Sequence, residues 1–226
     1  MRKIISSFIF CITGAFLNMI VFRIFISMMG LPLYLDTIFT IAVTFLCGPL
    51  WGVLTGALTN IISVTVFGWE WYLFALCNIV TALITWLFIR LFSCELNLRI
   101  NAAADSNTPA ALAGHSVFTA KLLHQTSSRR LSAIMDRLIV LTLLSFALCL
   151  VMSILGGCIS VFIGFFKADA VNPAAVPTMF NRNVPILLNE MFSRIPINII
   201  DRLISAFTAF GVALVVFQIA KKNERG

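Results

Sequence analysis

Ionisable side chains are scarce in this chain, and some of them stand inside long apolar stretches. Nine of the 226 residues are acidic, whereas 60% are hydrophobic. Asp36 lies in LPLYLDTIFT, and the pair Asp201 and Arg202 lies in INIIDRLIS. A charge inside a bilayer is expensive, so such residues usually face a protein interior or a water-filled cavity. Carboxylate and guanidinium groups in a cavity can bind the polar parts of a small molecule. We therefore take these three residues as candidate ligand contacts.

Further polar and aromatic residues are candidates for the same cavity, because they lie in or beside the same apolar stretches. The amides of Asn60 and Asn198 can hydrogen-bond a ligand, and Arg23 supplies another charge. Trp69 and Trp71 can form an aromatic wall or lid, a surface that suits flat heterocycles. Together with the first three residues, these side chains form the predicted binding site.

A purely structural explanation also exists for each of these residues. An aspartate near the start of a helix interacts favourably with the helix macrodipole, by about 0.3–1 kcal/mol. Arginines near helix ends can extend to the lipid headgroups, and tryptophans are common at membrane interfaces. The cavity interpretation is favoured for the charged set, because these separate effects do not explain why its members share one membrane level.

Residues that typically carry catalysis or bind metals are missing from the apolar stretches. The two histidines, His115 and His124, lie in a polar segment between apolar runs. No predicted helix carries His, Asp and Glu residues at metal-ligand spacing, and no P-loop is present. Serine catalysis with a histidine base would need a histidine in the membrane. The sequence therefore predicts a protein that is not an enzyme, needs no metal or cofactor and does not itself hydrolyse ATP.

Long apolar runs predict how the candidate residues are positioned. A helix needs about 20 apolar residues to cross a bilayer, and backbone groups in lipid must be hydrogen-bonded internally. The runs are continuous rather than alternating, which favours helices over a barrel. We therefore predict an all-α polytopic membrane protein with one membrane domain and six transmembrane helices. The predicted helices are 4–29, 32–47, 50–67, 71–92, 138–166 and 196–220, with a cytoplasmic loop at 93–137 and an outer loop at 167–195.

The distribution of basic residues predicts the orientation. Most of the 16 Lys and Arg residues fall near the two termini and in the 93–137 segment. Cytoplasmic loops are enriched in these residues, so both termini are predicted to lie inside the cell. The net charge of +7 is explained by this topology, and no nucleic-acid partner is predicted. In this orientation the candidate charged residues lie toward the outer face of the cell membrane.

Small residues recur at helical spacing in two of the predicted helices. Such stripes let helices approach closely in a membrane. The stripes are Gly48, Gly52 and Gly56 at the third helix, and Ser7, Cys11 and Ala15 in the first. The glycine stripe predicts packing within the molecule. The stripe in the first helix lies near the predicted cytoplasmic end and can either pack internally or face another membrane protein.

Two segments together resemble a known family. LPLYLDTIFTIAVTFLCGPLWGVLTGALTNIIS combines an apolar helix, a Gly-Pro turn with aromatic and glycine residues, and a Gly-rich helix ending in Asn. It resembles the substrate-binding S components of energy-coupling factor (ECF) transporters, which are bacterial importers of vitamins and other micronutrients. RIPINIIDRLISAFTAFGVAL is similar to the last helix of these proteins. The resemblance covers the predicted second, third and last helices.

The resemblance implies a function and a set of partners. It implies six helices, cytoplasmic termini and an outward-facing pocket, in a subunit surrounded by inner-membrane lipid that captures a vitamin or a related heterocyclic micronutrient. It also implies a transmembrane coupling protein with two ATPase subunits. Many members dock onto the coupling protein through an A-x-x-x-A pattern in the first helix, to which Ser7, Cys11 and Ala15 correspond here.

Other functions are compatible with the same outer cavity. The chain could be a membrane-embedded ligand sensor or accessory module that signals through the 93–137 segment. It could also be a stand-alone small-molecule facilitator, for which an inverted repeat would be expected, and none is found in the sequence. A fourth candidate, an enzyme that acts on lipid, lacks a catalytic set of residues.

Overall fold

The computed structural model describes residues 2–25, 33–96, 98, 118–166 and 185–223, and every regular element in these ranges is helical. This agrees with the predicted all-α fold. The elements are α1 (Arg2–Arg23), α2 (Ile38–Cys47), α3 (Pro49–Phe67), the 3-10 helix η2 (Trp69–Tyr72), α4 (Ala75–Leu91), α5 (Ser93–Leu96), α7 (Phe118–Phe166) and α8 (Ile186–Asn223).

Four of these helices are long and apolar enough to cross a membrane. They contain the stretches Ile4–Arg23, Pro49–Val66, Ser132–Ile163 and Ile186–Lys222. The helices α2 and α4 are also apolar but shorter. Large hydrophobic side chains are exposed on all four long helices, and a water-soluble protein would not leave so much apolar surface uncovered. The chain is therefore a polytopic membrane protein.

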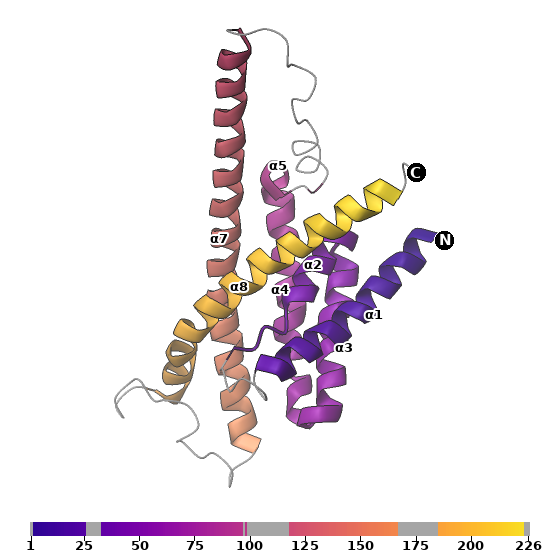
Figure 1. Cartoon of the computed structure of the whole chain (residues 1–226). Helices are drawn as coiled ribbons and strands as arrows, with labels where there is room; N and C mark the ends of the chain where they lie inside the picture. The colour runs from indigo at the N-terminus through magenta and orange to yellow at the C-terminus, as the bar shows by residue number, and fades with distance from the viewer. Residues whose placement is uncertain (1, 26–32, 97, 99–117, 167–184, 224–226) are drawn as a thin grey trace.

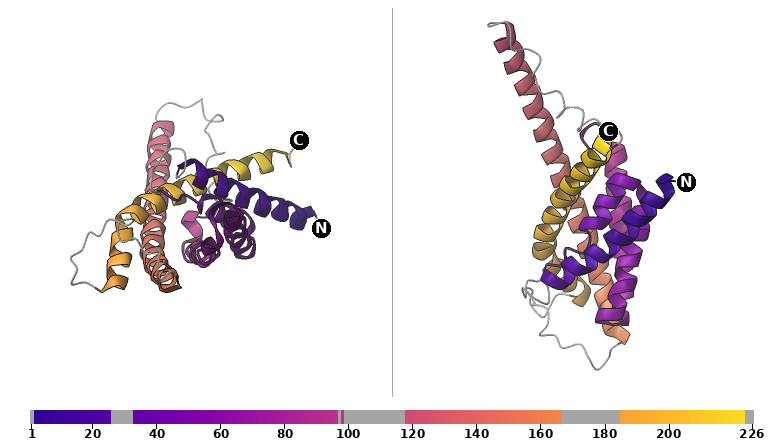
Figure 2. Two further views of the ribbon diagram at one scale, coloured as in Figure 1. Left: turned by 90° about the horizontal axis from the view of Figure 1, so that it is seen from below. Right: turned by 45° about the vertical axis from the view of Figure 1, so that its right-hand side comes forward.

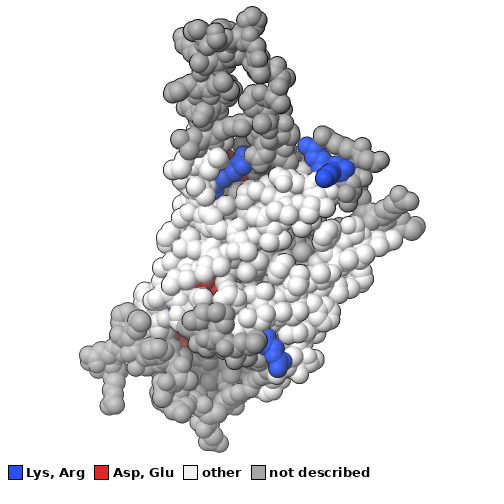
Figure 3. Space-filling view, viewed as in Figure 1, with Lys and Arg blue, Asp and Glu red and all other residues white. Residues whose placement is uncertain are grey.

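Charge is sparse on the surface between the two ends of the bundle. Figure 3 shows one face on which the middle of the molecule is almost entirely uncharged, while Lys and Arg lie toward the ends. Both chain termini lie at the same end of the bundle (Figures 1 and 2). The α1–α4 helices gather on one side, and the α7 and α8 helices cross each other beside them.

The α2 helix is central to this arrangement. It packs against α1, α3, α4 and α8, and most of its ten residues are buried. Its side chains Ile38, Ile41 and Ala42 join Leu35 in an apolar cluster with residues of α7 and α8. Because α2 touches four neighbours, the residues just before it are held at a junction where several helices meet.

Two helix starts near α2 differ from the prediction. The α2 helix begins at Ile38 rather than at residue 32, and residues 33–37 are non-helical. Leu35 has a φ of 45°, which is rare for residues other than glycine and ends any regular helix there. Similarly, α4 begins at Ala75 rather than at residue 71, because the η2 helix occupies the preceding turn. The start of α3 at Pro49 and its end at Phe67 agree closely with the predicted 50–67.

The two long helices begin earlier than predicted. The α7 helix starts at Phe118, so part of the predicted 93–137 loop is helical, while residues 99–117 lie outside the described residues. At 1.5 Å per residue, its 49 residues span about 74 Å, more than twice the hydrocarbon thickness of a bilayer. Figure 1 shows its first turns rising above the other helices. Hydropathy detected only the apolar part of this helix.

The α8 helix starts at Ile186, ten residues before the predicted start, and passes through Pro196. Part of the predicted outer loop is therefore helix, and residues 167–184 lie outside the described residues. Proline is favoured at a first helical position, which is why the sequence suggested a start at Pro196. Inside a helix proline instead removes one hydrogen bond and bends the axis, and α8 accommodates it.

The predicted glycine stripe packs within the chain at two of its three positions. A Cβ atom on Gly56 would lie 2.9 Å from the carbonyl carbon of Asn78, so α3 and α4 approach closely there. A Cβ atom on Gly52 would crowd both α2 and α4. Gly48 differs, because it lies in the turn before α3 with a φ of 91° and open space around it. Its role is to form the turn rather than to pack helices.

The small-residue stripe of α1 is turned inwards. Cys11 and Ala15 have 1% and 0% exposure, and Ser7 is half-buried. The α1 helix packs on α3 and α2. Cys11 and Ala15 are therefore covered by the chain's own helices, which agrees with the internal-packing alternative, and docking of a partner protein through this stripe stays a prediction.

Candidate functional site

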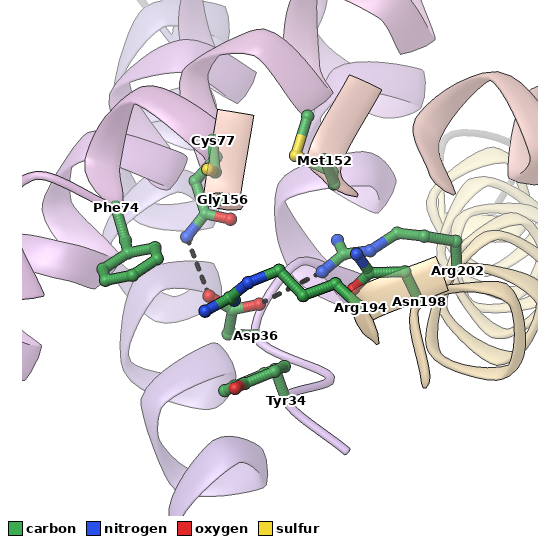
Figure 4. A pocket seen from close by; sticks show the side chains of 10 residues that line it. Tyr34, Asp36, Phe74, Cys77, Met152, Gly156, Arg194, Asn198 and Arg202 are labelled. Atoms are coloured by element: carbon green, nitrogen blue, oxygen red, sulfur yellow. Dashed lines mark hydrogen bonds and ion pairs between the residues drawn. The ribbon is translucent and has the colours of Figure 1, made fainter. Parts of the chain in front are cut away.

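A cavity of about 240 Å³ lies where the segment before α2 meets α4, α7 and α8 (Figure 4). It is lined by both charged and apolar side chains. These are Tyr34, Asp36, Phe74, Cys77, Asn78, Met152, Gly156, Arg194, Asn198 and Arg202. The surrounding bundle is strongly apolar, so a cavity with three charged side chains in its wall is the candidate binding site.

The α8 helix supplies three of the polar groups from one face. Arg194, Asn198 and Arg202 follow one another at intervals of four residues, which places them on the same side of a helix. This alignment needs the helix to continue across Pro196, as it does. Figure 4 shows the three side chains reaching from α8 toward Asp36.

The irregular segment before α2 supplies the opposite wall. The backbone N–H of Leu35 donates a hydrogen bond of 2.8 Å to Oδ1 of the buried Asp201. Arg202 donates a hydrogen bond of 2.5 Å to the hydroxyl of Thr37. These two bonds attach residues 35 and 37 to α8, and between them Asp36 turns into the cavity. The left-handed backbone at Leu35 is therefore fixed by contacts on either side of the site residue.

The two arginines of the site are not equally close to the carboxylates around them. Arg202 lies 2.7 Å from Asp201 but 3.9 Å from Asp36. Arg194 lies 3.5 Å from Glu190, one turn earlier in α8, and donates a hydrogen bond of 2.6 Å to Ser160 of α7. Each arginine thus has a nearer carboxylate than Asp36.

Amide side chains complete the wall. Asn78 of α4 donates a hydrogen bond of 3.1 Å to Asp36, and Asn198 donates one of 2.9 Å to Ser153 of α7. The asparagines therefore join α4 to the segment before α2, and α8 to α7. Four separate parts of the chain are connected through the polar lining of the cavity.

The polar network around the cavity is incomplete. Several buried side-chain atoms in the described part of the chain lack a hydrogen-bond partner, including Nε of Arg194 and Nε of Arg202. Buried polar groups in proteins are normally hydrogen-bonded, and exceptions call for an explanation. A bound small molecule or ordered water in the cavity would supply the missing partners.

The structure brings together only part of the predicted site. Asp36, Asn198 and Arg202 line the cavity, and Asp201 lies directly behind it in contact with Arg202. Three predicted residues lie elsewhere, and the side chain of a fourth lies outside the described residues. These are Asn60, Arg23 and Trp69, and the fourth is Trp71.

The three predicted residues that do not line the cavity lie in other environments. Asn60 donates a hydrogen bond to the Gly56 carbonyl of its own helix. Arg23 is exposed at the end of α1. Trp69 is 53% exposed and packs near Tyr72 in a separate, mainly apolar groove. Trp69 therefore does not line this cavity, and Tyr34 and Phe74 provide its aromatic surface.

Sequence reasoning missed seven lining residues, of which Asn78 and Arg194 are the most polar. Asn78 stands inside an apolar helix, and a polar side chain at such a position often belongs to a functional site. Arg194 shares the four-residue spacing of Asn198 and Arg202, but this signal appears only if α8 is taken to begin before Pro196. The others are Tyr34, Phe74, Cys77, Met152 and Gly156.

Metal coordination is not apparent in the described ranges, where no group of three or more His, Cys, Asp or Glu residues is placed to hold an ion. The cavity contributes Asp36, Cys77 and amide groups, which suit the binding of an organic molecule better than the coordination of a metal. In comparisons with known proteins, no family model, no curated protein and no solved structure matches this chain.

Proposed function

We propose that this chain is the substrate-binding membrane subunit of an ECF-type importer, and that the cavity beside Asp36 holds its substrate. The observation that carries the proposal is a polar cavity with unsatisfied arginine atoms in the middle of an apolar helical bundle. An incompletely paired polar network in a packed core is destabilising. Such a cavity is therefore better explained by ligand binding than by a structural role.

The cavity volume favours a small substrate. About 240 Å³ lies just below the usual 300–1,000 Å³ of ligand pockets. A single substituted ring or a compound of similar size fits this space, as expected for a vitamin or a related micronutrient. A larger substrate would need the helices around the cavity to separate.

The proposed importer needs partners for its energy. The sequence carries no P-loop, so a coupling protein and two ATPase subunits would supply ATP hydrolysis. The coupling protein would have to contact an exposed part of the bundle, since Cys11 and Ala15 are buried. The large apolar side chains on the outer face of α1, such as Ile4 and Phe8, are available for this contact.

One observation favours a ligand sensor as the second candidate. The α7 helix runs without interruption from the cavity residues Gly156 and Met152 to Phe118, well beyond the other helices. A rigid helix of this length could carry a ligand-dependent shift to the far end of the molecule. The two candidates share the same binding cavity and differ in the partner.

Native mass spectrometry of the gently purified protein tests the binding function. We expect one small molecule to be retained, and we expect Gly156→Leu to abolish its retention. A side chain at Gly156 would enter the cavity, where its Cβ atom would lie 3.5 Å from Arg194. The matched control is Gly211→Leu in α8, where a Cβ atom meets nothing within 4 Å.

Co-purification distinguishes the importer from the sensor. An importer subunit should copurify with a coupling protein and ATPases, and uptake of the retained compound should require ATP. Retention of the same molecule by wild type and Gly156→Leu would remove the cavity from consideration. Binding without any ATP-dependent uptake would favour the sensor.

A further inference from the structure

The described charged groups of the cavity wall, counted together with the ion-pair partners behind it, do not balance. Three carboxylates, Asp36, Asp201 and Glu190, face two guanidinium groups, Arg194 and Arg202. Arg202 is closest to Asp201, at 2.7 Å, and Arg194 pairs with Glu190 at 3.5 Å. Among the described groups one carboxylate is therefore left over, and the distances identify it as Asp36, whose single ion-pair contact in this part of the chain is 3.9 Å long.

Asp36 is also the acidic side chain that a molecule in the cavity can contact. Its side chain is 20% exposed and lines the cavity, whereas that of Asp201 is fully buried. A net negative charge in an apolar bundle is unfavourable unless an opposite charge compensates it. Asn78 donates one hydrogen bond to Asp36 but carries no charge. An occupant of the cavity with one positive charge would compensate this carboxylate.

The walls beside Asp36 suit an organic cation. Figure 4 shows the rings of Tyr34 and Phe74 on the same side of the cavity as Asp36. The ring of Tyr34 is held by stacking on Phe22, with ring centroids 6.1 Å apart and planes at 11°. Aromatic faces attract ammonium and other cationic groups. Met152 adds a polarisable apolar surface.

We propose that the cavity binds a small organic cation with one positive charge, either an ammonium group or a cationic heteroaromatic ring. The charge lies against Asp36 and the apolar body lies against Tyr34 and Phe74. This inference rests on the proposed binding function and names its substrate class. A bare metal ion would leave most of the 240 Å³ empty, since a water molecule occupies only about 30 Å³.

The two arginines do not make the cavity an anion site, and ordered water rather than the cation is expected to accept hydrogen bonds from their Nε groups. Each already has a closer carboxylate, and an anionic ligand would add to the negative excess. Their positive charges instead keep Asp201 and Glu190 compensated, so that only the charge of Asp36 remains for the ligand. This assignment predicts opposite responses to the removal of Asp36 and of Arg194.

Thermal shift and calorimetric titration of the purified full chain in detergent test the substrate class. The probes are choline and N-methylpyridinium, with three comparison compounds that share the shape of choline or part of it. These are the uncharged isostere with a tert-butyl group in place of trimethylammonium, the zwitterion glycine betaine, and the anion trimethylacetate. We expect the two cations to bind and the other three to bind at least about 10-fold more weakly.

Matched variants locate the charge that selects the ligand. Asp36→Asn should weaken cation binding by at least about 10-fold, since it removes the compensating carboxylate with almost no change in shape. Arg194→Gln should increase cation affinity, since it removes a positive charge from the wall of the cavity. Phe74→Leu should weaken cation binding by about 3- to 10-fold. Size-exclusion profiles and melting temperatures without ligand establish that each variant is folded.

Three results would overturn the inference. Binding of the zwitterion or anion that is lost in Arg194→Gln but kept in Asp36→Asn would replace the substrate class and leave the binding function intact. A response to sodium alone would replace the organic ligand with an ion. If no probe binds and native mass spectrometry finds no retained molecule, both the substrate class and the proposed function fail.

Discussion

Two polar clusters lie inside this apolar bundle, and they differ in how completely their hydrogen bonds are made. The Asn18 network joins α1, α2 and α3. Asn18 donates to the hydroxyls of Thr40 and Thr59 at 2.9 and 3.1 Å, and accepts a hydrogen bond of 2.8 Å from the N–H of Phe39. Around the cavity, by contrast, buried arginine nitrogens lack hydrogen-bond partners in the described part of the chain.

Burial alone does not separate the two clusters. Asn18 is fully buried, and Arg202 is only 5% exposed. The difference is that no residue of the Asn18 network lines the cavity beside Asp36 and the Asn18 amide makes three hydrogen bonds, while the cavity cluster borders open space. A complete network stabilises the helix arrangement, whereas an incomplete one next to a cavity is prepared for a ligand. The following predictions separate stability from binding on this basis.

The largest effect on stability is expected for Asn18→Leu. The substitution removes three hydrogen bonds that connect three helices, including one to an N–H in the first turn of α2. At about 0.6–1 kcal/mol for each bond, the free energy of unfolding should fall by about 2–3 kcal/mol. Denaturant titration in detergent measures this change, and choline affinity of the folded variant should stay within about twofold.

A matched control for Asn18→Leu is Thr142→Val. The exposed Thr142 hydroxyl bonds only to the Leu138 carbonyl of its own helix, so its loss should leave the free energy of unfolding nearly unchanged. A loss of choline binding in Asn18→Leu, with its stability intact, would reverse the assignment of the two clusters.

A smaller loss of stability is expected for Gly56→Ala. The new Cβ atom would lie 2.9 Å from the backbone of Asn78, so α3 and α4 would have to separate, at a cost of about 1–3 kcal/mol. Because Asn78 also contacts Asp36, this shift should disturb the cavity as well. Unfolding curves and choline titrations measure both effects together.

Gly211→Ala is the control for Gly56→Ala. A Cβ atom at Gly211 meets nothing within 4 Å, so the substitution should be neutral or stabilise α8 by up to about 1 kcal/mol through helix propensity. Equal stability of both variants would mean that α3 and α4 are not closely packed at this point.

Among the three substitutions that break a contact, the smallest loss of stability is expected for Asn78→Ala. It removes one hydrogen bond to Asp36, whose carboxylate borders the cavity and can accept a water molecule instead. The free energy of unfolding should fall by less than about 1 kcal/mol. Choline affinity should nevertheless fall by about 3- to 10-fold, because the carboxylate loses the group that orients it. A large loss of stability with unchanged choline affinity would place Asn78 with the Asn18 network.

The sequence predicted the membrane class, the helical fold and three of the residues that line the cavity. Long apolar runs and the cost of charges among them were sufficient for this, and Asp36, Asn198 and Arg202 do line one cavity. Asp36 lies more than 160 positions from Asn198 and Arg202 in the sequence. The prediction grouped them because they were expected at a similar depth in the membrane. In the structure, α2 packs against α8, and this contact brings the three residues into one site.

What the sequence did not predict depends on how helices continue and pack. Hydropathy marks where a helix is apolar, so it could not show that α7 extends beyond its apolar part. Pro196 looked like a helix start, and Arg194 was therefore assigned to a loop. The small residues Cys11 and Ala15 suit internal and external packing equally well, and only the neighbouring helices show that they face inwards.

Pro196 lies between the cavity residues Arg194 and Asn198 of the same helix. Without its N–H, the helix lacks one internal bond at this point, and bending there is easier than elsewhere along α8. The part after Pro196 is fastened to Leu35 and Thr37 through Asp201 and Arg202, while the part before it is fastened to α7 through Ser160. A change of a few degrees in this bend would therefore move one guanidinium relative to the other. The width of the cavity and the electric field inside it thus depend on the bend of α8 at Pro196.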